Sequence, residues 1–143
     1  LALESVTAGV LNNVQIGWGD TAAVASTATP IADQDWAYLE FNIANSPNWR
    51  LRTRITGAAI VTVDTGVAAT VAQTDFSVQV LTNGIVIAKV GATETRSAVG
   101  AITGNKSDWH WLVRIESDDA GGDDQSLTID SIACSEARTN FTT

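Results

Sequence analysis

The sequence predicts an all-β protein, a two-sheet antiparallel sandwich of jelly-roll-like type with eight or nine strands. Short stretches of alternating apolar and polar residues recur along the chain, and glycine, proline and asparagine separate them. Valine, isoleucine and threonine, which fit pleated surfaces, are frequent. No stretch has the apolar spacing of an amphipathic helix longer than a turn or two. We expect one domain over residues 1–143, with an N-terminal arm at 1–10 and a C-terminal tail at 137–143.

The strongest pattern lies in residues 35–55, which predict a hairpin of two half-buried strands. Apolar residues alternate with polar ones in both halves, and the second half reads WRLRTRI, with its arginines on the polar side. The stretch Ser46-Pro47-Asn48 between the halves has the composition of a turn. With the turn centred on Ser46, the expected cross-strand pairs are Phe41 with Leu51, Glu40 with Arg52, and Tyr38 with Arg54.

The remaining elements follow from the same alternation and from turn residues. Asn83-Gly84 predicts a second hairpin, because both positions tolerate positive φ. The other expected strands or irregular segments are 1–10 (a strand or an arm on a neighbouring subunit), 13–18, 21–29 (irregular or an edge strand), 58–64, 65–74 (a loop or a poorly specified strand), 75–81, 85–90, a short strand near 97–102, 109–117, and 126–136 with a bulge near 130–131.

Composition excludes several classes of protein. The net charge is −8 and the pI is about 4.3, which opposes binding to nucleic acid. The basic cluster Arg50, Arg52 and Arg54 is interpreted as a solvated, salt-bridged sheet face opposite Glu40. The single cysteine, Cys134, is expected to be a small buried hydrophobe. No stretch approaches the ~20 apolar residues of a membrane span.

The sequence predicts no enzyme, because no catalytic constellation stands out. His110 is the only histidine, and we interpret it as an ordinary surface or packed residue. The acidic loop with Asp118, Asp119, Asp123 and Asp124 offers oxygen ligands of the kind calcium prefers, but its spacing is not that of an EF-hand. A solvated acidic turn is the favoured interpretation of this loop.

Three stretches together resemble the jelly-roll domains of carbohydrate-binding-module type that occur in secreted enzymes and in phage tail and surface proteins. They are TPIADQDWAYLEFNI with WRLRTRI, the later strand WHWLVRIES, and the closing strand SLTIDSIACSE. The resemblance implies a structural calcium ion near the positions of Glu4 and Asp130. No other cofactor is expected.

The tryptophans are the best candidates for core packing and for ligand contact. Trp36, Trp49 and one of Trp109 and Trp111 are expected to fill the core. Trp18, between two glycines, is predicted to lie in a turn as the most exposed of the five. For sugar binding, the stacking residues would be Trp18, Tyr38 and Trp109.

Two functions follow from these observations. The first is a structural subunit that associates with copies of itself or with a larger assembly, as in virion decoration, tail or extracellular filament proteins. Scarce lysine, abundant small and β-branched residues and the lack of a catalytic motif favour it. The alternative is a carbohydrate-binding module with glycans as partners. Either function predicts an extracellular or virion-surface location.

Overall fold

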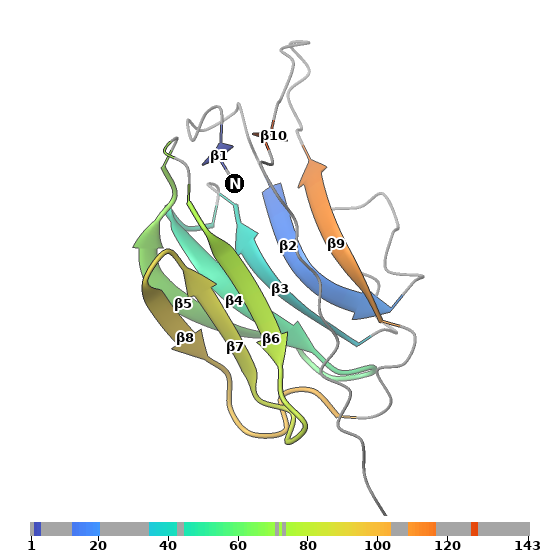
Figure 1. Cartoon of the computed structure of the whole chain (residues 1–143). Helices are drawn as coiled ribbons and strands as arrows, with labels where there is room; N and C mark the ends of the chain where they lie inside the picture. Colours follow the sequence, from blue (N-terminus) through green and yellow to red (C-terminus); the bar gives the residue numbers. More distant parts are fainter. Residues whose placement is uncertain are drawn as a thin grey trace, which may run out of the picture.

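A computed structural model describes residues 2–3, 13–20, 35–42, 45–70, 72, 74–103, 109–116 and 127–128. These residues form no helix, and eight antiparallel strands build a five-stranded and a three-stranded sheet (Figure 1). The prediction of an all-β, two-sheet sandwich is therefore confirmed. No membrane-spanning helix occurs in this part of the chain.

The large sheet has the strand order β5-β4-β3-β2-β9, and the small sheet has the order β6-β7-β8. A separate pair joins β1 to β10. Neighbouring strands are mostly consecutive in sequence, except that β9 returns to lie beside β2. A jelly-roll connectivity stays a prediction. The strand bounds are β1 Ala2–Leu3, β2 Asn13–Asp20, β3 Trp36–Phe41, β4 Asn48–Arg54, β5 Val61–Ala68, β6 Phe76–Val80, β7 Val86–Val90, β8 Thr93–Arg96, β9 Trp109–Glu116 and β10 Leu127–Thr128.

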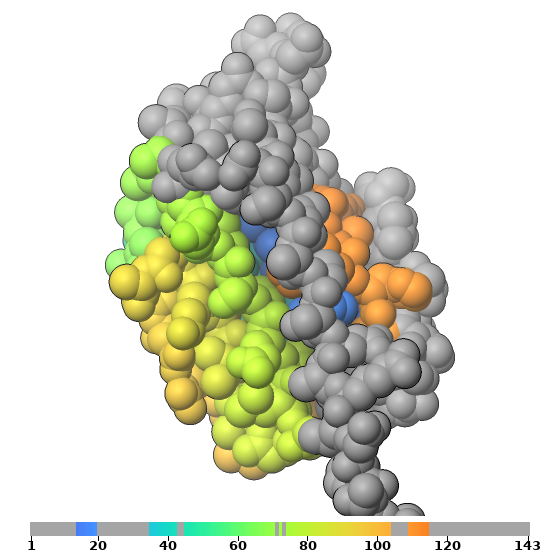
Figure 2. Space-filling view, in the orientation of Figure 1, coloured from blue at the N-terminus to red at the C-terminus, as the bar shows by residue number. Residues whose placement is uncertain are grey.

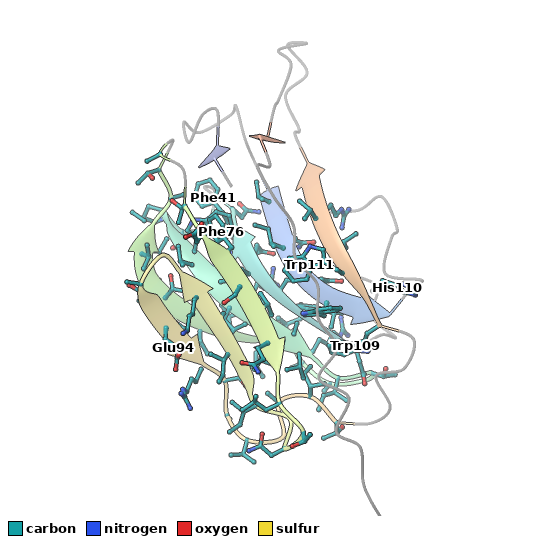
Figure 3. All side chains as sticks on the ribbon, in the orientation of Figure 1. Phe41, Phe76, Glu94, Trp109, His110 and Trp111 are labelled. Carbon is teal, nitrogen blue, oxygen red and sulfur yellow. The ribbon has the colours of Figure 1, made fainter. Side chains whose placement is uncertain are left out.

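The hydrophobic core lies between the two sheets. At one end of it Phe41, Trp49 and Phe76 form an aromatic chain, with ring centroids 5.7 Å apart for the first pair and 4.6 Å for the second (Figure 3). Aromatic pairs at such distances add to the burial energy of the rings. The buried core comprises Val14, Ile16, Ala37, Leu39, Phe41, Trp49, Leu51, Val78, Val86, Ala88, Val90 and Ile102.

The hairpin of β3 and β4 forms as predicted, but its cross-strand pairs are shifted by two residues. Leu39 pairs with Leu51 and Glu40 with Arg50, so the predicted pairs Phe41 with Leu51, Glu40 with Arg52 and Tyr38 with Arg54 are wrong. The turn is centred on Asn45 instead of Ser46, because the amides of Asn45 and Ser46 both donate to the carbonyl of Asn42 at 3.0 Å. A shift of two residues leaves every side chain on the predicted face.

The second predicted hairpin is confirmed as β6 and β7, with residues 81–85 between the two strands. Only Gly84 has positive φ, at 77°, and the amide of Leu81 donates to the carbonyl of Ile85 at 2.8 Å. This is the glycine-bulge type of hairpin, so Asn83 needs no positive φ.

Other boundaries differ from the prediction. β5 begins at Val61 and runs into 65–74, the segment predicted as a loop or a poorly specified strand. The short strand expected near 97–102 lies instead at Thr93–Arg96. The predicted segment 21–29, the tail 137–143 and most of 1–10 and 126–136 lie outside the described residues.

Candidate functional site

Trp18 lies in the strand β2 and not in a turn, which corrects the prediction. Its indole is half-buried against Trp111 of β9, with ring centroids 5.3 Å apart in an edge-to-face contact. Its Nε1 donates a hydrogen bond of 2.8 Å to the carbonyl of Val78 on β6. Trp18 therefore links the two sheets, and its polar atom already has a partner.

The other two predicted sugar-stacking residues differ in their exposure. Tyr38 is only 1% exposed, so the structure leaves no face of its ring open to a ligand. Trp109 is half-buried on the same side of β9 as Trp111 (Figure 3). Tyr38 is thus buried and Trp18 and Trp109 are half-buried, and sugar stacking by these residues stays a prediction.

The residues predicted for calcium, Glu4 and Asp130, lie outside the described residues, as do the acidic loop 118–124 and Cys134. Within the described part of the chain, no three His, Cys, Asp or Glu residues gather closely enough to hold a metal ion. His110 is exposed on β9 and points away from Trp111 (Figure 3).

The outer face of the large sheet, turned away from the core, carries an unusual set of side chains that we call the arginine face. Strand β3 is buried on both of its sides, whereas antiparallel sheets commonly have one solvated face. The interpretation of a solvated face is therefore wrong for β3, whereas the three arginines of β4 are half-buried. The arginine face comprises Gln15 of β2, Trp36, Tyr38 and Glu40 of β3, Arg50, Arg52 and Arg54 of β4, and Arg114 of β9.

Glu40 is the anionic centre of this face and is 1% exposed. Arg50 donates to Oε1 at 2.6 Å, Arg52 donates to Oε2, and Gln15 donates to Oε2 from Nε2 at 3.1 Å. Paired arginines offset the cost of burying this carboxylate, so the predicted salt bridging is confirmed. Each of the two carboxylate oxygens of Glu40 is thus paired with a different arginine of strand β4.

The side chain of Tyr38 lies over the neighbouring strand β2, because the β2 residues that it covers are glycines. A Cβ at Gly17 would lie 3.0 Å from the Tyr38 ring and 2.1 Å from the carbonyl oxygen of Ala37, and one at Gly19 would lie 2.3 Å from the Tyr38 hydroxyl. Glycine within a strand commonly marks such a close approach. Burial raises the pKa of Tyr38 to about 12, although the positive charge of Arg114 opposes the shift.

Among the described strands of the two sheets, four are edge strands, and three of these are protected against pairing with another chain. β8 is short, and its Glu94 forms ion pairs with Lys89 and Arg96. β5 has an irregular register around Gly66, whose φ is 71°. The third, β6, has the carbonyl of Val78 occupied by the indole of Trp18. Short length, charge, bulges and covered polar groups are the usual protections of sheet edges.

The fourth edge, β9, carries the charged residues Arg114 and Glu116, but it is neither short nor irregular. Its eight residues, WHWLVRIE, contain no lysine or proline, and they pair with β2 in an unbroken register from Trp109 to Glu116. Among the described strands, β9 has a neighbour on one side only. Its residues reach the molecular surface beside β2 (orange in Figure 2). A long, regular and apolar edge of this kind is a template for another strand.

Comparisons with family models, curated proteins and solved structures gave no match for this chain.

Proposed function

We propose that this protein is a non-enzymatic structural subunit that assembles by pairing the free edge of β9 with β9 of a second copy. The setting we propose is a virion decoration, a tail or an extracellular filament. The observation that carries the proposal is the contrast between β9 and the three protected edges.

Pairing of two β9 strands is compatible with two-fold symmetry. Antiparallel pairing of identical strands is an isologous contact, in which each copy offers the same surface. It would join two five-stranded sheets into one continuous sheet and satisfy the backbone groups along both edges. The tryptophans on the inner side of β9, Trp109 and Trp111, would gain apolar neighbours from the second copy.

The test is the oligomeric state of the whole chain, measured by sedimentation as a function of concentration. The variant carries His110→Lys and Leu112→Lys, which place two lysines on the edge strand. The matched control carries Ser77→Lys and Gln79→Lys, both on exposed positions of the protected edge β6. Circular dichroism verifies that both variants stay folded.

We expect the native chain and the β6 control to associate, and the β9 variant to be monomeric. Because each copy carries a net charge of −8, added sodium chloride should strengthen association by screening the repulsion between copies. A native chain that is monomeric at every concentration and salt level would refute the proposal. So would equal association of the β9 variant and the native chain.

A further inference from the structure

The loop between β6 and β7 contains a sequence with a chemical reactivity of its own. Asn83 is exposed and is followed by Gly84, and this is the only Asn-Gly pair in the chain. The backbone nitrogen that follows an asparagine can attack the carbonyl carbon of the asparagine side chain, which closes a succinimide ring. Glycine opposes this attack least, because it has no Cβ to obstruct the ring. By sequence, Asn83 is therefore the asparagine of this chain most prone to spontaneous deamidation.

The folded loop holds Asn83 in a conformation that does not allow this ring to close. The Gly84 amide donates to the carbonyl of Leu81 at 3.0 Å and thereby closes a β-turn in which Asn83 is the third residue. Among the described residues only glycines have positive φ, so the turn is of type I and ψ of Asn83 is about 0°. A succinimide ring is nearly planar and includes Cβ, so it requires a ψ about 120° away from this value. Cyclisation must therefore rotate the peptide group that joins Asn83 to Gly84.

Residues 97–102, which follow β8 and which we call the strap, hold this peptide group in place. The amide of Gly100 donates to the carbonyl of Asn83 at 3.2 Å, and the amide of Ile102 donates to the carbonyl of Gly84 at 3.1 Å. A Cβ on Gly84 would lie 2.2 Å from the carbonyl oxygen of Ile102, so the strap lies directly against the loop (Figure 1). Because the strap is bonded to both carbonyls, the peptide group cannot rotate until the strap moves away.

The two ends of the strap are fastened by different interactions. At its start, Oγ of Ser97 accepts a hydrogen bond from the amide of Val86 at 2.8 Å, and the amide of Ser97 donates to the carbonyl of Val86 at 2.9 Å. At its end, the side chain of Ile102 is 1% exposed and belongs to the core. Between these anchors, Val99 is 73% exposed. A segment with few buried contacts opens locally at a lower free energy than the whole domain unfolds.

We propose that Asn83 is a gated site of deamidation, in which the closed strap blocks the reaction and local opening of the strap permits it. In the open loop the Gly84 amide loses its proton to hydroxide, and its nitrogen forms a bond to Cγ of Asn83. The side-chain nitrogen of Asn83 takes a proton from water, its bond to Cγ breaks, and ammonia leaves. Water then adds to one of the two ring carbonyl carbons and breaks the bond from that carbon to the Gly84 nitrogen.

The two products should act differently on the strap. Hydrolysis at Cγ gives aspartate, whose main chain is unchanged and whose carboxylate can accept from the amide of Ile85, as Oδ1 of Asn83 does at 3.2 Å. Hydrolysis at the backbone carbonyl carbon gives isoaspartate, whose main chain runs through Cβ and Cγ and is longer by one atom. The added atom displaces Gly84 from its close contact with Ile102, so the strap cannot close again. Because ammonia is lost, this release is irreversible.

The experiment follows the whole chain in mildly alkaline buffer by mass spectrometry, which counts deamidation at Asn83 and separates isoaspartate from aspartate by their fragments. Two variants loosen the strap, Ile102→Ala at its core anchor and Ser97→Ala at its polar anchor. Val99→Ala, on the exposed part of the strap, is the matched control. Val14→Ala, in the core beneath β2, controls for a loss of overall stability. The native chain in urea supplies the rate of the unprotected loop.

We expect the native chain to deamidate about a hundredfold more slowly when folded than in urea, because the closed strap dominates the population. Ile102→Ala and Ser97→Ala should each raise the rate of the folded chain about tenfold, whereas Val99→Ala and Val14→Ala should keep the native rate. The isolated isoaspartate form should unfold at a lower temperature than the native chain, and Asn83→Asp should keep the native thermal midpoint.

Equal rates in the folded and the urea-unfolded native chain would overturn the proposal. So would a native rate in the strap variants, or a rate in Val14→Ala as high as theirs, which would mean that the reaction requires global unfolding. Should circular dichroism show that Ile102→Ala is unfolded, Ser97→Ala alone decides. An isoaspartate form as stable as the native chain would refute the irreversible release of the strap.

Discussion

Replacing Gly19 by alanine tests the packing of Tyr38 directly. The new Cβ would lie 2.3 Å from the Tyr38 hydroxyl oxygen, 3.2 Å from Cζ of that ring and 3.3 Å from Cβ of Trp36. Optimal carbon contacts are about 3.5–4.0 Å, so the methyl group overlaps the hydroxyl by more than about 1 Å. Tyr38 has no room to retreat, because it is buried and stacked on Trp36. We expect Gly19→Ala to lower the free energy of unfolding by about 1–3 kcal/mol.

The same substitution should cost far less when Tyr38 is first changed to phenylalanine. Without the hydroxyl, the closest remaining contact is the one of 3.2 Å with the ring carbon, which a small shift relieves. Alanine also loses less backbone entropy on folding than glycine does, by roughly 0.5–1 kcal/mol. Gly19→Ala should therefore be nearly neutral in the Tyr38→Phe background, and the interaction energy of the double-mutant cycle should be about 1–2 kcal/mol.

The assay is urea unfolding followed by tryptophan fluorescence, in chloride buffer free of phosphate and sulfate. A matched control is Gly57→Ala, because Gly57 has a φ of 75° and a Cβ added there would have no neighbour within 4 Å. Its cost comes from the backbone alone and should be the same with Tyr38 or phenylalanine. Equal costs of Gly19→Ala in both backgrounds would refute the close approach of Tyr38 to β2.

Two further predictions concern the charged and ionisable groups of the arginine face. Burial raises the pKa of Tyr38 to about 12, and an unfolded tyrosine titrates near 10, so the folded state favours the protonated phenol. Stability should be unaffected by this group below about pH 10 and should fall by about 2–3 kcal/mol between pH 10 and 12. Tyr38 is the only tyrosine, so its phenolate absorbance reports it alone; Tyr38→Phe should remove this slope, and ionisation of the folded protein near pH 10 would contradict the prediction. Glu40→Ala should cost about 2–4 kcal/mol in urea unfolding, because it leaves the half-buried Arg50 and Arg52 without their anion. The control Glu94→Ala, in an exposed network, should cost no more than about 1 kcal/mol, and equal costs for the two would show that Glu40 is effectively solvated.

The face on which each side chain lies could be predicted from the sequence, but the residue opposite it on the neighbouring strand could not. Alternation assigned Leu39 and Leu51 to the core and Glu40 and Arg50 to the other side, and the structure agrees. The register depends on the turn, where hydrogen bonds to the carbonyl of Asn42 moved the centre by one residue. Composition marks a turn without fixing its centre, and a shift of two residues leaves the alternation unchanged.

The glycines on either side of Trp18 show a second limit of sequence reasoning. Two glycines around a tryptophan have the composition of a turn, yet here they belong to a regular strand. Their role is to make room for Tyr38, which is distant in sequence and adjacent only after β2 and β3 pair. The alternation of Val14, Ile16 and Trp18 extends through Gly17, and this was the available signal that the strand continues.

The burial of the arginine face could not be predicted, because alternation shows which side chains share a face and not whether that face meets water. Half of the eight basic residues lie on this face in a chain whose net charge is −8. A sandwich needs only one apolar core, so folding alone does not require a second buried layer with charged groups. Glu40 accounts for Arg50 and Arg52, but it does not account for Arg54 or for the unpartnered donors of Trp36 and Tyr38.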